Sequence, residues 1–153
     1  MNEQALTNLA RAIIDEISYM TLGTADENGL PWVSPVWFAS DEYHEFFWVS
    51  SPERRHSRNI AARPEVAIVI FDSRVPISTG QAVYMSAVAE EATGSDVERG
   101  IQVFSRRSEA EEARPWGVDD VSGQARLRLY RAAASEHFVL GAQDERIPVD
   151  LGH

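Results

Sequence analysis

The sequence predicts a single mainly-β domain, a small antiparallel barrel with peripheral helices, and three observations support this. The chain has 153 residues, the size of one domain. Its middle alternates short apolar or β-branched stretches with turn signals, the pattern of an antiparallel meander of six or seven strands. Helical periodicity is confined to segments before and between these stretches. Because no repeat or linker interrupts the pattern, we expect one domain over residues 1–153.

The first half of the chain predicts a helix followed by three strands. Apolar residues recur at helical spacing over residues 3–17. Strands over 19–24 and 31–39 flank Asn28-Gly29, and Asn-Gly is the strongest short hairpin signal. Aromatic residues then predict a strand over 45–50. These elements form one antiparallel meander.

The second half predicts two further strands, short helices and a closing pair of strands. A helix over 54–62 is expected to end before Pro64, because the residue preceding proline disfavours helical geometry. An apolar run predicts a buried strand over 66–71, and a longer strand follows over 81–91. The remaining expected elements are helices opened by capping boxes at Ser95 and Ser108, and strands over 124–132 and 136–140.

Composition excludes several classes of function. With 24 acidic against 14 basic residues, the net charge is −10, so we expect no nucleic-acid partner. The absence of cysteine excludes disulfides, thiolate nucleophiles and cysteine metal sites. All 14 basic residues are arginine, and without lysine no Schiff base to pyridoxal phosphate can form.

Neither a membrane nor a metal is indicated as a partner. No apolar run approaches a membrane span, and the acidic, helical N-terminus does not resemble a secretory signal, so we expect a cytoplasmic protein. The four histidines, at positions 44, 56, 137 and 153, are widely separated and suggest no metal site.

Two local features indicate chemistry. Residues 54–63, RRHSRNIAAR, place four of the 14 arginines in an otherwise acidic chain. Arginine forks and the amides at a helix start bind phosphate, although a solvated helix face paired with acids is an equal alternative. The second feature is a group of aromatic residues on consecutive strands: Trp32, Trp37, Phe38, Phe46, Phe47 and Trp48. Strand alternation sends about half of them inward as core, and the others suit a flat cofactor ring.

With these features in place, the chain resembles a known family. The strands GLPWVSPVWF and FFWVSSP, followed by ERRHSRNIAARPEVAIVIF, resemble the pyridoxamine-phosphate-oxidase-like flavoproteins with the FMN-binding split β-barrel. The likeness is good over about residues 5–92 and looser over the closing strands. It implies a six- to seven-stranded antiparallel split barrel, FMN as cofactor, and a homodimer with flavin sites at its interface.

The resemblance also implies roles for particular residues. It places the FMN phosphate on Arg54, Arg55, His56 and Ser57, and leaves open which arginine faces it. Family members usually carry a lysine where His56 stands. The flavin ring would lie against Ser34, Pro35, Val36 and Trp37 of the second strand and Val49, Ser50 and Ser51 at the end of the third. Gln81 would correspond to a glutamine near the ring.

The implied function is an FMN-dependent oxidoreductase acting on a small molecule. Vitamin B6 oxidation itself is not expected, because the C-terminal arginine and histidine of that oxidase have no counterpart in DERIPVDLGH. Two alternatives stay open: a deazaflavin-dependent reductase on the same fold, and a flavin-binding protein without turnover. No catalytic acid or base is assigned; Tyr84, Tyr130 and His137 are candidate proton donors, but a core or surface role is the better explanation of each.

The longer acidic tail of deazaflavin would need a positively charged exit from the phosphate site. Arg58 and Arg63 could supply it. Alternatively, they face solvent or pair with Glu53 and Glu65, the commoner outcome for exposed charges. FMN is therefore the expected cofactor, with deazaflavin as the alternative.

Overall fold

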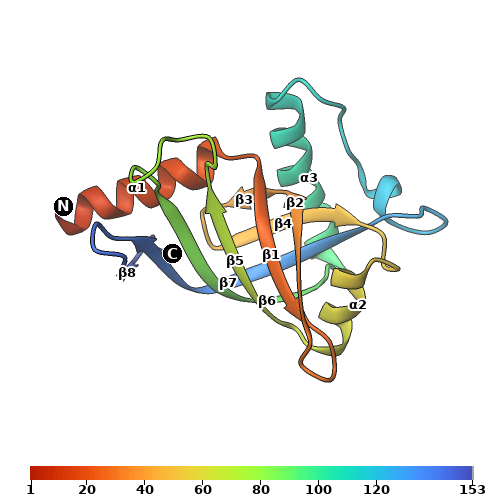
Figure 1. The fold of residues 1–153 in the computed structure, drawn as a ribbon. Coiled ribbons are helices and arrows are strands. Elements are labelled where there is room, and N and C mark those ends of the chain that lie inside the picture. The colour runs from red at the N-terminus through yellow and green to blue at the C-terminus, as the bar shows by residue number, and fades with distance from the viewer. Residues whose placement is uncertain (153) are drawn as a thin grey trace.

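The computed structural model describes residues 1–152 and shows a curled antiparallel sheet with three α-helices around it (Figure 1). The strands are β1 (Tyr19–Ala25), β2 (Pro31–Trp37), β3 (Ala39–Asp41), β4 (Glu45–Ser50), β5 (Glu65–Phe71), β6 (Ala82–Glu91), β7 (Arg128–Leu140) and β8 (Arg146–Val149). The helices are α1 (Glu3–Glu16), α2 (Arg55–Ala62) and α3 (Ser95–Ala110), with a 3₁₀ turn, η1, over Val118–Val121. This confirms the predicted mainly-β split barrel.

The barrel closes through one chain segment that changes partner. The strand order is β2-β1-β5-β6-β7-β4-β3, with β8 added to β7. The two end strands, β2 and β3, are separated in sequence only by Phe38, which is fully buried. β2 pairs with β1 and β3 pairs with β4, so the single strand expected over 31–39 is in fact two. The switch at Phe38 brings β2 and β4 into contact.

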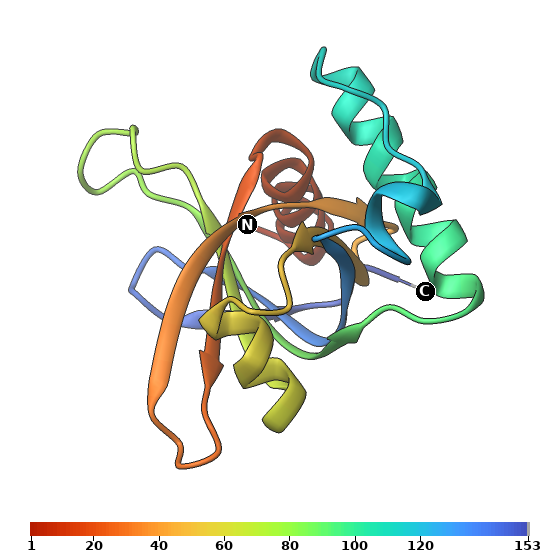
Figure 2. The ribbon, with the colours of Figure 1, turned by 90° about the vertical axis from the view of Figure 1, so that its right-hand side faces the viewer.

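The barrel interior forms the main core. The largest fully buried side chains there include Phe38, Phe46 and Trp48, and burial of each such side chain contributes about 1.5–3 kcal/mol. α1 adds Ala10, Ile13 and Ile14 to this core, and α2 adds Ile60. A second cluster lies outside the barrel under α3, which stands over β3 and β4 (Figure 2). The first cluster positions α2 and the second positions α3.

Two predictions for the C-terminal third are wrong in detail. The closing strands over 124–132 and 136–140 are one long strand, β7. Ser86 pairs with Glu136 and Ala87 with Ala134, so Ser135 is the extra residue of a β-bulge, and the apparent break is a kink in a continuous strand. β8 was not predicted.

The expected capping boxes are also absent. α3 is a single helix whose N-cap is Gly94, and no side chain caps it. Ser108 lies inside that helix, where its hydroxyl donates to the Arg114 carbonyl oxygen over 2.6 Å. Within residues 1–152, no helix has the length and apolar character needed to cross a membrane.

Candidate functional site

The N-terminus of α2 presents backbone donors that the protein itself does not use. A tight turn at Ser51 leads into the helix, because the Arg54 N–H donates to the Ser51 carbonyl over 3.2 Å. The first helical bond runs from the Arg58 N–H to the Arg54 carbonyl. Within residues 1–152, the three N–H groups between them, on residues 55–57, meet no acceptor, and no side chain caps the helix. Free amides at a helix start form an anion site.

Contacts to β1 and to the β1–β2 hairpin hold α2 in place. The Asn59 side-chain amide donates to the Thr24 hydroxyl over 3.0 Å, and both residues are buried. Arg63 donates from Nε to the Asp26 carbonyl (3.1 Å) and from Nη2 to the Glu27 carbonyl (3.2 Å). Arg63 therefore stabilises the hairpin turn, and its expected pairing with a glutamate is wrong. These bonds fix the direction in which the free amides point.

The other arginines of the cluster have no carboxylate partner among the described residues. Arg54 is exposed at the N-cap, and the Arg55 guanidinium lies 4.1 Å from the centre of the Trp32 ring. Arg58 donates to the backbone carbonyl of Glu53 and not to its carboxylate. The alternative in which acids neutralise these arginines therefore does not hold over residues 1–152, and their positive charge remains available to a ligand.

His56 contributes hydrogen bonding and no charge. Its ring is buried, and its Nε2 lies 3.0 Å from the Ser50 hydroxyl. Burial, and then the positive charge of Arg54, lowers the pKa of His56 below its usual value, so the ring is neutral near pH 7. At this position the chain therefore places a neutral imidazole and leaves the positive charge to the arginines.

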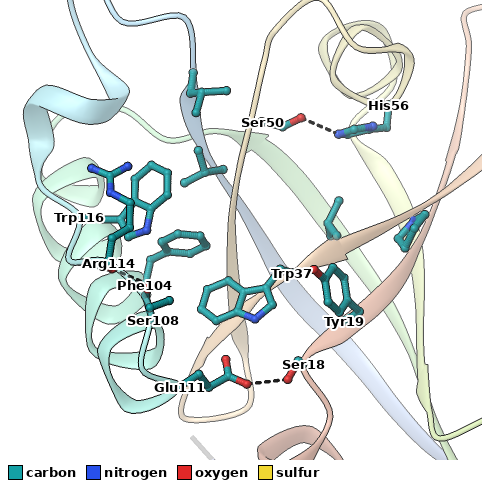
Figure 3. Close-up of a pocket in the computed structure, with 15 residues that line it drawn as sticks. Ser18, Tyr19, Trp37, Ser50, His56, Phe104, Ser108, Glu111, Arg114 and Trp116 are labelled. Atoms are coloured by element: carbon teal, nitrogen blue, oxygen red, sulfur yellow. Dashed lines mark hydrogen bonds between the residues drawn. The ribbon is translucent and has the colours of Figure 1, made fainter.

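A cleft of about 650 Å³ extends from His56 to α3 (Figure 3). Six of the residues predicted to bind the cofactor line it: Pro35, Val36, Trp37, Val49, Ser50 and His56. They come from β2, β4 and α2, and the partner switch at Phe38 places these three elements together. The volume is typical of small-molecule sites.

The remaining predicted residues lie outside the cleft walls. Ser51 is buried in the turn before α2, and Ser57 is buried against Tyr130. Ser34 lies on β2 and Arg54 at the start of α2, whereas Arg55 lines a second hollow on the other side of that helix. Gln81 lies apart, in a hollow between α1 and the β7–β8 turn. Within one chain, Gln81 therefore does not meet the predicted flavin residues.

One wall of the cleft has no counterpart in the sequence prediction. It consists of α3, the segment that follows it and the start of β1, which contribute Ser18, Tyr19, Phe104, Ser108, Glu111, Ala113, Arg114, Trp116 and Leu127. The sequence offers only a local signal here, because Pro115 and Gly117 flank Trp116 and such residues are typical of a loop. A loop signal does not say which surface the loop covers.

None of the three candidate proton donors lines the cleft. The Tyr84 ring lies under the Arg146 guanidinium, 4.5 Å away. Tyr130 is buried and stacked on Trp48, and burial raises its pKa. His137 is buried, and its Nε2–H donates to the Tyr43 carbonyl over 2.7 Å. These roles are structural.

Metal ligands do not gather within the described chain. In residues 1–152, no three side chains of the histidine, aspartate or glutamate type lie close enough to hold a metal ion. His153 lies outside the described residues.

Fold and site together define a split barrel with a cleft beside a helix N-terminus, and the comparisons name the family. The model of the pyridoxamine 5'-phosphate oxidase family matches residues 6–136. The chain therefore belongs to the pyridoxamine 5'-phosphate oxidase family, as the sequence resemblance indicated. Comparison with curated proteins gives no significant match.

Solved structures with this fold have diverse ligands. The heme storage protein HutZ from Vibrio cholerae is 24% identical, with a TM-score of 0.67 over 84% of this chain and 90% of that one. A heme binding protein from Mycobacterium smegmatis is 18% identical with a TM-score of 0.76, over 95% of this chain but only 58% of that one. An F420 reductase is 17% identical, with a TM-score of 0.61 over 84% and 94%. At these identities the likeness shows the fold alone.

Proposed function

We propose that the protein binds FMN in this cleft and acts as an FMN-dependent oxidoreductase on a small molecule. The observation that carries the proposal is the start of α2, where three free backbone N–H groups lie beside arginines without carboxylate partners. A phosphate is the group that such a combination recognises best. The adjoining cleft has the apolar walls that a flat ring needs.

The residues present fit the two parts of FMN. The amides of residues 55–57 and one or both of Arg54 and Arg55 would hold the phosphate, while neutral His56 and Ser50 add hydrogen bonds beside it. The ring would lie against Pro35–Trp37 and Val49. β2 is an end strand of the sheet, so half of its backbone groups remain free to bond polar ring atoms. FMN supplies the redox chemistry when bound, and the chain binds and orients it.

Deazaflavin is the second candidate, and one observation favours it. Arg58 has no carboxylate partner within residues 1–152 and lines a hollow of about 420 Å³ beside the phosphate site, where an acidic tail could lie. Arg63 is already bonded to the hairpin carbonyls and is not free for such a tail. Because only Arg58 of these two arginines could bind the acidic tail of deazaflavin, FMN remains the first choice.

Cofactor titration tests the proposal. We expect apo-protein to bind FMN with saturable quenching of flavin fluorescence, and expect weaker binding of deazaflavin coenzyme and heme. Deazaflavin binding at least about tenfold tighter than FMN would make the protein a deazaflavin-dependent reductase. Preferred heme binding would place it functionally with the heme-binding relatives. If FMN-loaded protein is reduced by no nicotinamide donor and passes electrons to no acceptor, it is a flavin carrier.

We further propose that the functional unit is a homodimer. The outer face of β2, β1, β5 and β6 is largely apolar and uncovered, with Val33 65% and Val88 52% exposed. Pro35 belongs to both this face and the cleft, so a second copy seated on the face would border the cofactor site. Large apolar interfaces of this kind are typical of obligate dimers.

A further inference from the structure

The α3 side of the cleft is walled by three aromatic side chains in contact. The rings of Trp37 and Phe104 are 4.8 Å apart at 85°, and those of Phe104 and Trp116 are 5.4 Å apart at 83°. Figure 3 shows these three rings together, apart from Ser50 and His56 across the cleft. All three residues line the cleft, so a flat ligand in it would lie against aromatic side chains.

The charged groups on this side of the cleft are already neutralised. Glu111 accepts a 2.6 Å hydrogen bond from the Ser18 hydroxyl and pairs with Arg107 over 3.3 Å. Arg114 pairs with Asp120 over 2.9 Å, and its guanidinium lies 3.9 Å from the centre of the Trp116 ring. This side therefore differs from the α2 side, where arginines and amides lack partners.

The segment that carries Trp116 is anchored before any ligand arrives. The Trp116 N–H donates to the Ser105 hydroxyl over 2.8 Å, and the Gly117 N–H donates to the Asp120 carboxylate over 2.9 Å. The Ser108 hydroxyl holds the Arg114 carbonyl. A wall fixed in this way costs little ordering entropy on binding.

We propose that the α3 side of the cleft is the substrate subsite and that it accepts neutral, planar ring compounds. Trp37, Phe104 and Trp116 would enclose the ring, and Trp37 also borders the cofactor site, so the ligand would lie beside the flavin. An anionic ligand is disfavoured, because its charge would lie beside the Glu111 carboxylate while Arg107 and Arg114 are already paired with acids. The assignment as a substrate site rests on the proposed FMN function, whereas the preference for neutral rings rests on this wall alone.

Calorimetric titration with 2-naphthol and 2-naphthoate, two probes of nearly equal shape, tests the inference. At about pH 7.5 the first is neutral and the second is an anion. We expect 2-naphthol to bind both apo- and FMN-loaded protein at least about tenfold more tightly than 2-naphthoate. Equal binding of the two probes, or tighter binding of 2-naphthoate, would overturn the inference.

Substitutions in the aromatic wall test whether 2-naphthol binds there. We expect Trp116→Ala to weaken 2-naphthol binding at least about fivefold while FMN affinity stays unchanged, and Trp116→Phe to restore most of it. Val118→Ala, an exposed position on the same segment outside the cleft, should bind as the parent does. If Trp116→Ala does not fold, Phe104→Leu replaces it. Unchanged 2-naphthol affinity in a folded variant contradicts the subsite.

The two proposals fail in different ways. If the parent protein does not bind FMN but binds 2-naphthol in a way that depends on Trp116, the proposed function is wrong and the site for neutral rings remains. FMN binding without any 2-naphthol binding would keep the function and remove the subsite.

Discussion

At the start of α2, charge and hydrogen bonding are divided between neighbouring side chains. His56 faces the cleft as a buried neutral ring bonded to Ser50, whereas Arg54 and Arg55 remain cationic on the surface. A single lysine would combine both tasks in one flexible side chain. In the proposed FMN site, the affinity for the phosphate would therefore depend on several residues together.

Replacing Arg54, Arg55 and His56 together with alanine should weaken FMN binding by well over a factor of ten, because charge-assisted hydrogen bonds are the strongest available here. Flavin fluorescence titration measures the change, and the single variants show which arginine faces the phosphate. Arg106→Ala, an exposed arginine on α3, is the matched control. Unchanged affinity in a folded triple variant would remove this site from consideration.

Acidification should destabilise the fold at the buried histidines. Burial lowers the pKa of both His137 and His56, so between these folded-state values and the ordinary value of about 6.5 the unfolded chain binds more protons. Stability is therefore complete above about pH 6.5 and falls as the pH drops below it. Urea unfolding at several pH values measures how steeply the unfolding free energy falls with decreasing pH. His137→Gln, which can still donate to the Tyr43 carbonyl, should make this fall less steep. An equally steep fall in that variant would exclude His137 as a source of the pH dependence.

At the scale of elements, α3 depends on one glycine for its close approach to the barrel. A Cβ at Gly100 would lie 2.6 Å from Cε1 of Phe47 and 2.8 Å from Cδ2 of Leu129. No side chain fits at these distances unless the buried side chains of Phe47 and Leu129, the helix or the strands shift. The aromatic wall of the cleft therefore depends on packing at a residue that does not line it.

Gly100→Ala should destabilise the protein by about 1–3 kcal/mol, because overpacking outweighs the gain of about 1 kcal/mol in helix propensity. Chemical denaturation measures the difference in unfolding free energy. Gly80→Ala is the control, since a Cβ there meets nothing within 4 Å. A Gly100→Ala protein as stable as the parent would mean that α3 is not packed as described.

For the whole molecule, the exposed apolar sheet face predicts a dimer. Light scattering at micromolar concentration should give twice the chain mass of 17.1 kDa. Val33→Glu should shift the protein toward monomer, because it would place a charge in an apolar interface, whereas Val118→Glu, away from the sheet, should not. A parent protein that scatters as a single chain would exclude the dimer.

Local patterns in the sequence were enough to predict most elements, and the family resemblance predicted six of the 15 residues that line the cleft. Periodicity, the Asn28-Gly29 turn and Pro64 place α1, the β1–β2 hairpin and α2 within a few residues of their observed bounds. The partner switch at Phe38 brings the predicted cofactor residues on β2, β4 and α2 together, whereas each of the three sets is a contiguous stretch that the sequence identifies. Short-range geometry of this kind is encoded by neighbouring residues.

Only the tertiary structure decided the rest. The partner switch at Phe38 depends on which strands lie on either side of it, and the bulge at Ser135 makes one strand of two expected ones. The cleft wall around Trp116 is set by how α3 packs on β4 and β7 across the glycine at position 100. The tertiary structure also places Gln81 in a different hollow from the other predicted cofactor residues. These features depend on contacts between residues far apart in the chain, and local sequence patterns do not encode such contacts.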